Sequence, residues 1–237
     1  MPQVFQTFWW KGALSPYEVA CLRSFIAHGH EVQLFTYDED LAAPPGVVVA
    51  DARDILPESR VFHYASGFGA GSVSAFSNLF RYCLLFERGG WWIDTDVLCL
   101  TPDIPDLPLF YAWQDAREIN CAVMKFPPGH VVMDECRKAA EAVGDKATWG
   151  QMGPTLLTET LLRKGLQHFA FPPSFCYPIH YENTARLFEK VAGEVVVDRR
   201  LTWMLHLWNQ RIVQLGVDKQ APPDATTLLG RLISAVP

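Results

Sequence analysis

The sequence predicts an α/β fold, with a mostly parallel central sheet flanked by helices. It opens with a strand-like segment at Val4–Trp10, an amphipathic helix, and an alternating strand at Glu31–Tyr37. A strand, a helix and a second strand in that order indicate a parallel pair in one sheet. A second helix then runs directly into a bulky, β-prone segment at Trp91–Ile93, and 49% of the 237 residues are hydrophobic, enough for a sizeable core.

The first helix carries a clear start signal. Ser15 suits the N-cap, Pro16 the first helical position, and Glu18 lies three residues after the cap, as in a capping box. We expect this helix to run to about His28 and to stop at Gly29.

A short third strand is expected at Val47–Ala50, followed by a long irregular stretch from Asp51 to Val73. Loops of this length in a compact domain are often functional. The glycines near its end do not match a phosphate-binding loop, because no Gly-Lys-Ser/Thr follows, and GFGAG lacks the spacing of a dinucleotide fingerprint.

The most informative stretch is Ser77–Leu100. An apolar helix face ends at the two glycines Gly89 and Gly90, which can adopt positive φ, and a buried strand follows. That strand ends in two carboxylates, Asp94 and Asp96, which as residues two apart on a strand are expected to point to one face.

Two adjacent carboxylates repel each other, and burying them unpaired is costly. A hard divalent cation such as Mn²⁺ or Mg²⁺ resolves this conflict, and it can also bridge to a diphosphate leaving group. We therefore assign Asp94 and Asp96 as candidate catalytic and metal-binding residues, with an Asp-rich turn as the simpler alternative.

Ser77, Asn78 and Arg81 lie within one turn of the helix that precedes the carboxylates, and they project to the same side. A hydroxyl, an amide and a guanidinium suit a ribose and a phosphate, so the three are candidate residues for binding a nucleotide. An exposed polar helix face is the alternative.

The rest of the chain adds fewer signals. Further elements are expected as follows: an extended connection at TPDIPDLPLF, a strand at Asn120–Phe126, a helix at Gly129–Val143, a Gly-Pro turn and amphipathic helix within Gly150–Gly165, an irregular segment at Leu166–Tyr181, and a short docking helix within about 224–236. The length predicts one domain over residues 1–237.

The segment FSNLFRYCLLFERGGWWIDTDVLCL resembles the core motif of DXD-containing glycosyltransferases of the GT-A fold. It is most similar to the family of α-1,4-galactosyltransferases, initiating mannosyltransferases and capsule or lipopolysaccharide sugar transferases (glycosyltransferase family 32-like). That family usually has Asp where Asn78 stands and Tyr where Trp92 stands.

The resemblance implies a metal-dependent transfer, with Mn²⁺ or Mg²⁺, from a nucleotide-diphosphate sugar to a hydroxyl of a glycan or lipid-linked acceptor. UDP is the expected nucleotide, a galactose-type sugar is the first expectation, and retention of anomeric configuration is implied. A front-face substitution is expected, since no carboxylate stands out as a nucleophile.

The resemblance also implies roles for four residues outside the core motif. Trp9 matches a tryptophan of the family, and either Trp9 or Trp10 could stack on the base, with core packing as the alternative. Gly153 belongs to the Gly-Pro element that follows the sugar pocket. His206 matches a late third metal ligand, and Trp208 of the same His-x-Trp-Asn element would shape the pocket around the leaving group or sugar.

The same resemblance places Gln114, Asp115 and Glu118 near the sugar, with an exposed polar loop as the alternative for each residue.

Composition excludes other classes. The net charge of −6 and the lack of a basic run argue against a nucleic-acid partner. The sequence contains no run of 18 apolar residues, so we expect no membrane span. The N-terminus lacks the features of a signal peptide. We expect a bacterial cytoplasmic enzyme of polysaccharide biosynthesis, with peripheral contact at the inner face of the membrane as a second alternative. The six scattered cysteines are expected to be reduced core residues.

Two other functions stay open. Phosphatases of the haloacid-dehalogenase type also place Asp-x-Asp at a strand end, but they have Thr or Val where Leu98 stands. A non-catalytic nucleotide-sugar-binding module is the other, since Asn78 departs from the family pattern.

Overall fold

The computed structural model describes residues 2–193 and 195–237. Its helices and strands, in chain order, are β1 (Val4–Trp9), α1 (Pro16–Ala27), β2 (Glu31–Thr36), β3 (Val47–Asp51), α2 (Ser74–Glu87), β4 (Gly90–Ile93), β5 (Val97–Cys99), β6 (Phe110–Trp113), β7 (Ile119–Phe126), α3 (Val131–Val143), α4 (Leu156–Arg163), β8 (Met204–His206), α5 (Asn209–Gln214) and α6 (Leu228–Ser234). Short 3-10 segments and one π-turn at Gln151–Thr155 lie in the connections.

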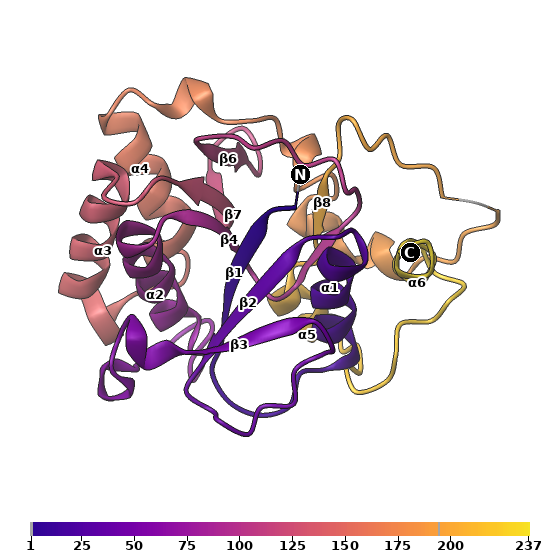
Figure 1. The fold of residues 1–237 in the computed structure, drawn as a ribbon, viewed down its shortest axis with the longest axis horizontal. Coiled ribbons are helices and arrows are strands. Elements are labelled where there is room, and N and C mark those ends of the chain that lie inside the picture. Colours follow the sequence, from indigo (N-terminus) through magenta and orange to yellow (C-terminus); the bar gives the residue numbers. More distant parts are fainter. Residues whose placement is uncertain (1, 194) are drawn as a thin grey trace.

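Within the described residues, six strands form one sheet in the order β3-β2-β1-β4-β7-β6 (Figure 1). The pairs β1–β2, β2–β3 and β1–β4 are parallel, whereas β7 runs antiparallel to both β4 and β6. β5 and β8 form a separate antiparallel pair. The α/β prediction with a mostly parallel sheet is confirmed.

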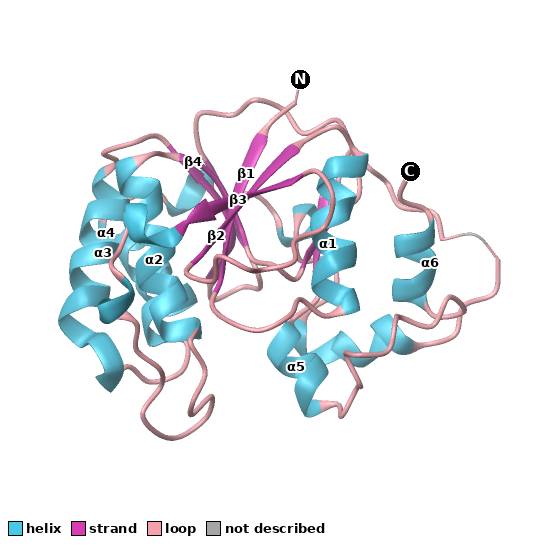
Figure 2. Ribbon diagram, turned by 60° about the horizontal axis from the view of Figure 1, so that its bottom comes forward, coloured by secondary structure: helices cyan, strands magenta, loops and turns pink. Residues whose placement is uncertain are grey.

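Helices cover both faces of this sheet. Figure 2 shows α2, α3 and α4 on one side and α1 and α6 on the other. Because neighbouring residues of a strand point to opposite faces, each strand supplies both cores. Trp92 and Phe8 pack into the core against α2, whereas Trp91 and Phe5 pack into the core against α1.

The start of α1 follows the sequence prediction. The Ser15 hydroxyl accepts from the Tyr17 N–H, and the Glu18 carboxylate accepts from the Ser15 N–H at 3.0 Å, which completes a capping box.

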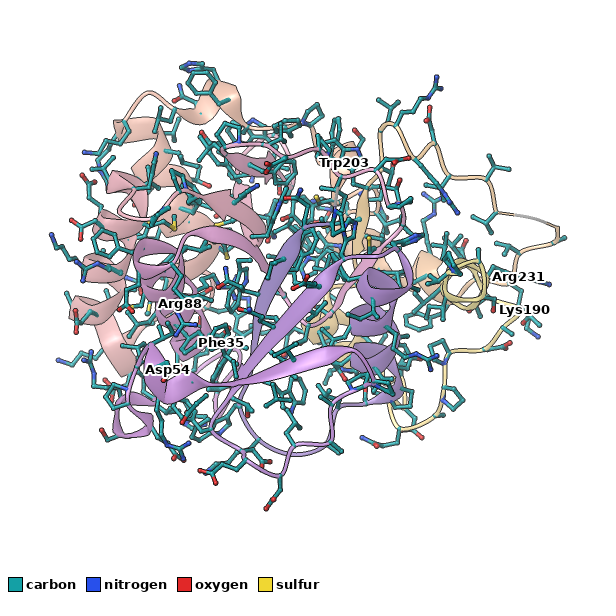
Figure 3. All side chains as sticks on the ribbon, viewed as in Figure 1. Phe35, Asp54, Arg88, Lys190, Trp203 and Arg231 are labelled. Carbon is teal, nitrogen blue, oxygen red and sulfur yellow. The ribbon has the colours of Figure 1, made fainter. Side chains whose placement is uncertain are left out.

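Side-chain contacts and a glycine turn lie at the end of α2, where the chain turns into β4. Arg88 lies 3.3 Å from Asp54 and over the ring of Phe35, and Figure 3 labels the three side chains together. Gly89 then has a φ of 65°, and a Cβ there would come within 2.6 Å of the Pro128 nitrogen. Glycine is therefore needed for both conformation and space.

Several elements differ from the sequence prediction. β4 ends at Ile93, so Asp94 and Asp96 lie in the turn between β4 and β5, closed by a hydrogen bond from the Val97 N–H to the Asp94 carbonyl at 3.2 Å. β6 was not predicted, because its four residues follow a proline-rich run and pair with the distant β7. α6 begins only after its N-cap Thr227, so it is shorter than the predicted segment.

Each of the six cysteines is a described residue, and each is buried and free, as predicted. Among the described residues, the structure contains no helix of the length and apolarity that crossing a membrane requires.

Candidate active site

A cavity of about 760 Å³ opens at the carboxyl ends of β1 and β4. Ligands of open α/β sheets bind at such strand ends. The residues predicted from the sequence that line it are Trp9, Ser77, Asn78, Arg81, Asp94, Asp96, His206 and Trp208.

Asp94, Asp96 and His206 form the chemical centre of this cavity. Each offers one ligand atom, and these atoms all lie within 4.8 Å of one another. The pairing of β5 with β8 creates the group, because its register places His206 directly opposite Val97, the residue after Asp96. The Nε2 atom of His206 lies 3.3 Å from Oδ1 of Asp96.

Asp94 is held from the α2 side. Its Oδ1 lies 3.0 Å from Nη2 of Arg81 and accepts a hydrogen bond from Nε1 of Trp92 at 2.8 Å. Burial raises the pKa of Asp94, with Asp96 adding to the rise and Arg81 opposing it. The carboxylate therefore carries an electrostatic cost that a second positive charge would reduce.

Asp96 is held from the opposite side. Its Oδ2 accepts from the Asn209 N–H at 2.7 Å, and its carbonyl accepts from the Leu207 N–H at 2.9 Å. Burial would raise the pKa of Asp96, but the His206 imidazole, the Asn209 N–H and the charge of Lys219 outweigh it and lower the pKa to about 2. Asp96 is thus kept ionised while it is buried.

Trp208 connects this centre to the wall of the cavity. It is the one non-glycine residue of the described chain with positive φ, at 61°, a conformation that costs a bulky residue about 1–2 kcal/mol. Its ring lies 4.2 Å from that of His206, and its Nε1 donates to the Ile179 carbonyl at 2.7 Å. These contacts hold the strained backbone that directs the Asn209 N–H at Asp96.

The donor set fits a divalent cation. Two carboxylates and an imidazole are ligands that Mn²⁺ accepts, and Mg²⁺ binds to carboxylates. The Nδ1 atom of His206 is buried and makes no hydrogen bond, so the ring is not committed to a protein partner on that side.

The three nucleotide-binding candidates of α2 differ in the protein contacts that their side chains make. Arg81 is almost fully buried, and besides Asp94 it donates from Nη1 to the Cys121 carbonyl at 2.6 Å. Its first role in this structure is therefore to orient Asp94. Ser77 and Asn78 also line the cavity.

Gly153 lies behind Asn78 and is not among the residues that line the cavity. A Cβ at this position would lie 3.3 Å from side-chain atoms of Asn78 and from Sγ of Cys121. The glycine lets the π-turn approach the cavity lining closely. Trp9 lines the cavity while its Nε1 donates to the Gly12 carbonyl at 2.7 Å.

A polar network covers another part of the lining. Glu118 accepts from Thr155 at 2.8 Å and from Gln114 at 3.1 Å, and Gln114 accepts from Asn120 at 2.5 Å. Gln114 and Glu118 were predicted to border a sugar, and both line the cavity, whereas Asp115 is not among the lining residues.

Sequence reasoning missed a group of aromatic residues that line the cavity. Phe68 and Trp149 are each about half exposed, and they meet with ring centroids 4.9 Å apart, beside Tyr64. The only sequence signal was the length of the loop that carries Tyr64 and Phe68, since nothing local indicates that Trp149 faces it.

Comparisons with known proteins point to one family. The family described as "Alpha 1,4-glycosyltransferase conserved region" matches residues 125–235. The chain is 27% identical to human alpha-1,4-N-acetylglucosaminyltransferase over 177 residues, covering 67% of this chain and 51% of that protein. It is 28% identical to lactosylceramide 4-alpha-galactosyltransferase of Rattus norvegicus over 147 residues, covering 57% and 41%.

The chain thus spans about half the length of the curated relatives that it matches. Among solved structures, the PaToxG glycosyltransferase is similar with a TM-score of 0.51 and 13% identity, covering 69% of each chain, which supports the fold. These matches lend no support to the phosphatase alternative. Over residues 125–235 the chain is thus similar to the alpha-1,4-glycosyltransferase family, and its curated relatives are glycosyltransferases of the same linkage type.

Proposed function

We propose that the chain is a metal-dependent glycosyltransferase that transfers a sugar from a nucleotide-diphosphate sugar to an acceptor hydroxyl. The observation that carries the proposal is the convergence of Asp94, Asp96 and His206 at the base of a cavity large enough for a small-molecule ligand. Similarity to the alpha-1,4-glycosyltransferase family supports the reaction class.

In this proposal Asp94, Asp96 and His206 hold Mn²⁺ or Mg²⁺. The bound cation would supply neutralisation of charge on the diphosphate leaving group. Arg81 keeps Asp94 oriented, and the Asn209 N–H does the same for Asp96. Ser77 and Asn78 offer a hydroxyl and an amide to the nucleotide part of the donor.

The acceptor hydroxyl forms a bond to the anomeric carbon while the bond from that carbon to the diphosphate oxygen breaks, and the hydroxyl proton passes to the departing diphosphate. We propose retention of configuration, a UDP-sugar donor, with a galactose-type sugar as the first candidate, and a glycan or lipid-linked acceptor. Gln114, Glu118 and Asn120 offer hydrogen-bonding groups to sugar hydroxyls in the same cavity. A cytoplasmic location, with peripheral contact at the inner face of the membrane, belongs to the proposal as well.

A thermal-shift screen of nucleotide sugars, with and without Mn²⁺, tests the donor site. A ligand that binds the folded state raises the melting temperature by mass action. We expect a UDP-sugar to raise it only with Mn²⁺, and the shift to disappear in Asp96→Ala. The matched control is Asp103→Ala, which removes an exposed carboxylate outside the cavity lining and should keep the shift.

Turnover is then measured with the nucleotide sugar that binds. Release of UDP in the presence of acceptor glycans should fall by roughly two orders of magnitude in Asp96→Ala, the scale of losing one electrostatic stabiliser. Full activity in that variant would refute the metal assignment. Metal-dependent binding without any turnover would instead favour the non-catalytic module.

A further inference from the structure

We infer that Glu18, on the first helix, is a positioning residue for the metal site, and that it acts on Asp96 through Asn209. This inference rests on the proposed function, because it concerns the affinity of the Asp94–Asp96–His206 group for a divalent cation. Glu18 lies 78 positions before Asp96 in the chain, yet only one residue, Asn209, separates the two carboxylates in the network of hydrogen bonds.

The carboxylate of Glu18 is used by two separate sets of partners. One oxygen, Oε2, accepts from the N–H and hydroxyl of Ser15 and closes the capping box of α1. The other, Oε1, accepts from Nδ2 of Asn209 at 3.2 Å and is bonded to Nζ of Lys219.

Capping alone does not require this arrangement. A capping box works at an exposed helix start, and a glutamine serves there as well as a glutamate. Glu18, however, is only 1% exposed, and an ionised carboxylate is costly to bury unless it is paired. Lys219, from the loop between α5 and α6, offsets that cost. Besides closing the cap, the buried Glu18 carboxylate therefore offers a negatively charged hydrogen-bond acceptor to Asn209.

Asn209 passes this constraint to Asp96. It is the first residue of α5, its side-chain amide is bonded to Glu18, and its backbone N–H donates to Oδ2 of Asp96 at 2.7 Å. The N-cap residue Trp208 makes no side-chain capping hydrogen bond, and the Asp96 carboxylate accepts from the first N–H of α5 instead. The strained residue Trp208 immediately precedes it. Glu18 therefore holds Asn209, and Asn209 fixes one oxygen of Asp96 so that the other can face His206.

The decisive variant is Glu18→Gln. A glutamine has one acceptor oxygen, which the Ser15 N–H of the capping box can retain, so its NH₂ group would face the donors of Asn209 and Lys219. We expect the Mn²⁺ affinity to fall roughly 10- to 100-fold, the usual scale for losing a partner that orients a metal ligand. The full chain is titrated with Mn²⁺ alone, and the concentration of free Mn²⁺ is measured at each step from its electron paramagnetic resonance signal.

Two further variants separate positioning from folding. Ser15→Ala weakens the same helix start by about 1 kcal/mol but leaves Glu18 bonded to Asn209, so its melting temperature should fall while its Mn²⁺ affinity is kept. Glu18→Gln with Lys219→Met removes both charges of the buried pair and should regain melting temperature, without regaining Mn²⁺ affinity.

The outcomes are distinguishable. A weaker Mn²⁺ affinity in both Glu18→Gln variants, with normal affinity in Ser15→Ala, supports the inference. Equal affinities in wild type and Glu18→Gln, or recovery of affinity in the double variant, or an equal loss in Ser15→Ala, would overturn it while leaving the proposed function standing. A wild-type chain that binds no Mn²⁺ would overturn the proposed function, and this inference with it.

Discussion

Arg81 and Asp94 form a largely buried ion pair at the base of the cavity, with Nη2 and Oδ1 3.0 Å apart. The guanidinium side chain is 4% exposed and also donates to the Cys121 carbonyl, whereas the carboxylate is 26% exposed and faces the cavity. The arginine therefore supports one member of the candidate metal-binding group, and its removal should affect both stability and the site.

The first prediction concerns this pair. Arg81→Met leaves Asp94 without its cationic partner, and breaking a buried pair from one side costs about 3 kcal/mol. Urea denaturation should show a loss of this size, together with loss of donor binding. The matched control is Arg88→Met, which breaks an exposed pair with Asp54 and should cost less than about 1 kcal/mol. Equal small losses in the two variants would show that burial does not strengthen the Arg81 pair.

A second prediction concerns His206. His206→Ala removes one of the three candidate ligands, so the Mn²⁺ concentration needed for half-maximal donor binding should rise by at least about tenfold. His180→Ala is the control, because His180 is near Asp115 and is not among the residues that line the cavity. Unchanged metal dependence in His206→Ala would restrict the metal site to the two carboxylates.

The third prediction isolates the backbone strain at Trp208. Trp208→Gly and Trp208→Ala remove the same ring, but only glycine adopts a φ of 61° without cost. The glycine variant should therefore be more stable than the alanine variant by about 1 kcal/mol in urea denaturation.

At Trp203, which is also buried but is not among the residues with positive φ, the order should not favour glycine. A Trp208→Ala variant at least as stable as Trp208→Gly would show that the left-handed conformation is not retained when the ring is removed.

The fourth prediction concerns the thiols. Burial raises the pKa of Cys121 to about 11, despite the opposing charge of Arg81, and the pKa of Cys136 to about 12. Because the thiolate is the reactive form, a raised pKa makes the thiols inert near neutral pH.

A thiol-specific disulfide reagent at pH 7 should thus label no cysteine rapidly in the native protein and all six after denaturation. Rapid labelling of a native cysteine at pH 7 would contradict both the burial and the raised pKa.

Local sequence signals predicted the elements that carry the site. The capping box at Ser15 and Glu18, the helix that ends at Gly89, and the strand at Trp91–Ile93 each depend on neighbouring residues, and the structure contains all three. Helical spacing predicted that Ser77, Asn78 and Arg81 share one side of their helix, and all three line the cavity.

Predictions failed where a feature depends on residues that are distant in the chain or on the exact end of a strand. Asp94 and Asp96 were expected to share a face of a strand, but they share a turn, and it is the turn that brings both carboxylates into the cavity. β6 could not be recognised because its pairing partner, β7, determines it.

What the sequence by itself determined is the α/β fold class, the helix-Gly-Gly-strand segment and the identity of the two carboxylates, because each of these depends on residues a few positions apart. Only the tertiary structure decided that β8 places His206 beside Asp96, that Arg81 pairs with Asp94, and that Asn209 joins Glu18 to the site. These contacts join residues that are 13 to 191 positions apart in the chain. Their geometry arises from strand register and helix packing, which no short stretch of sequence encodes.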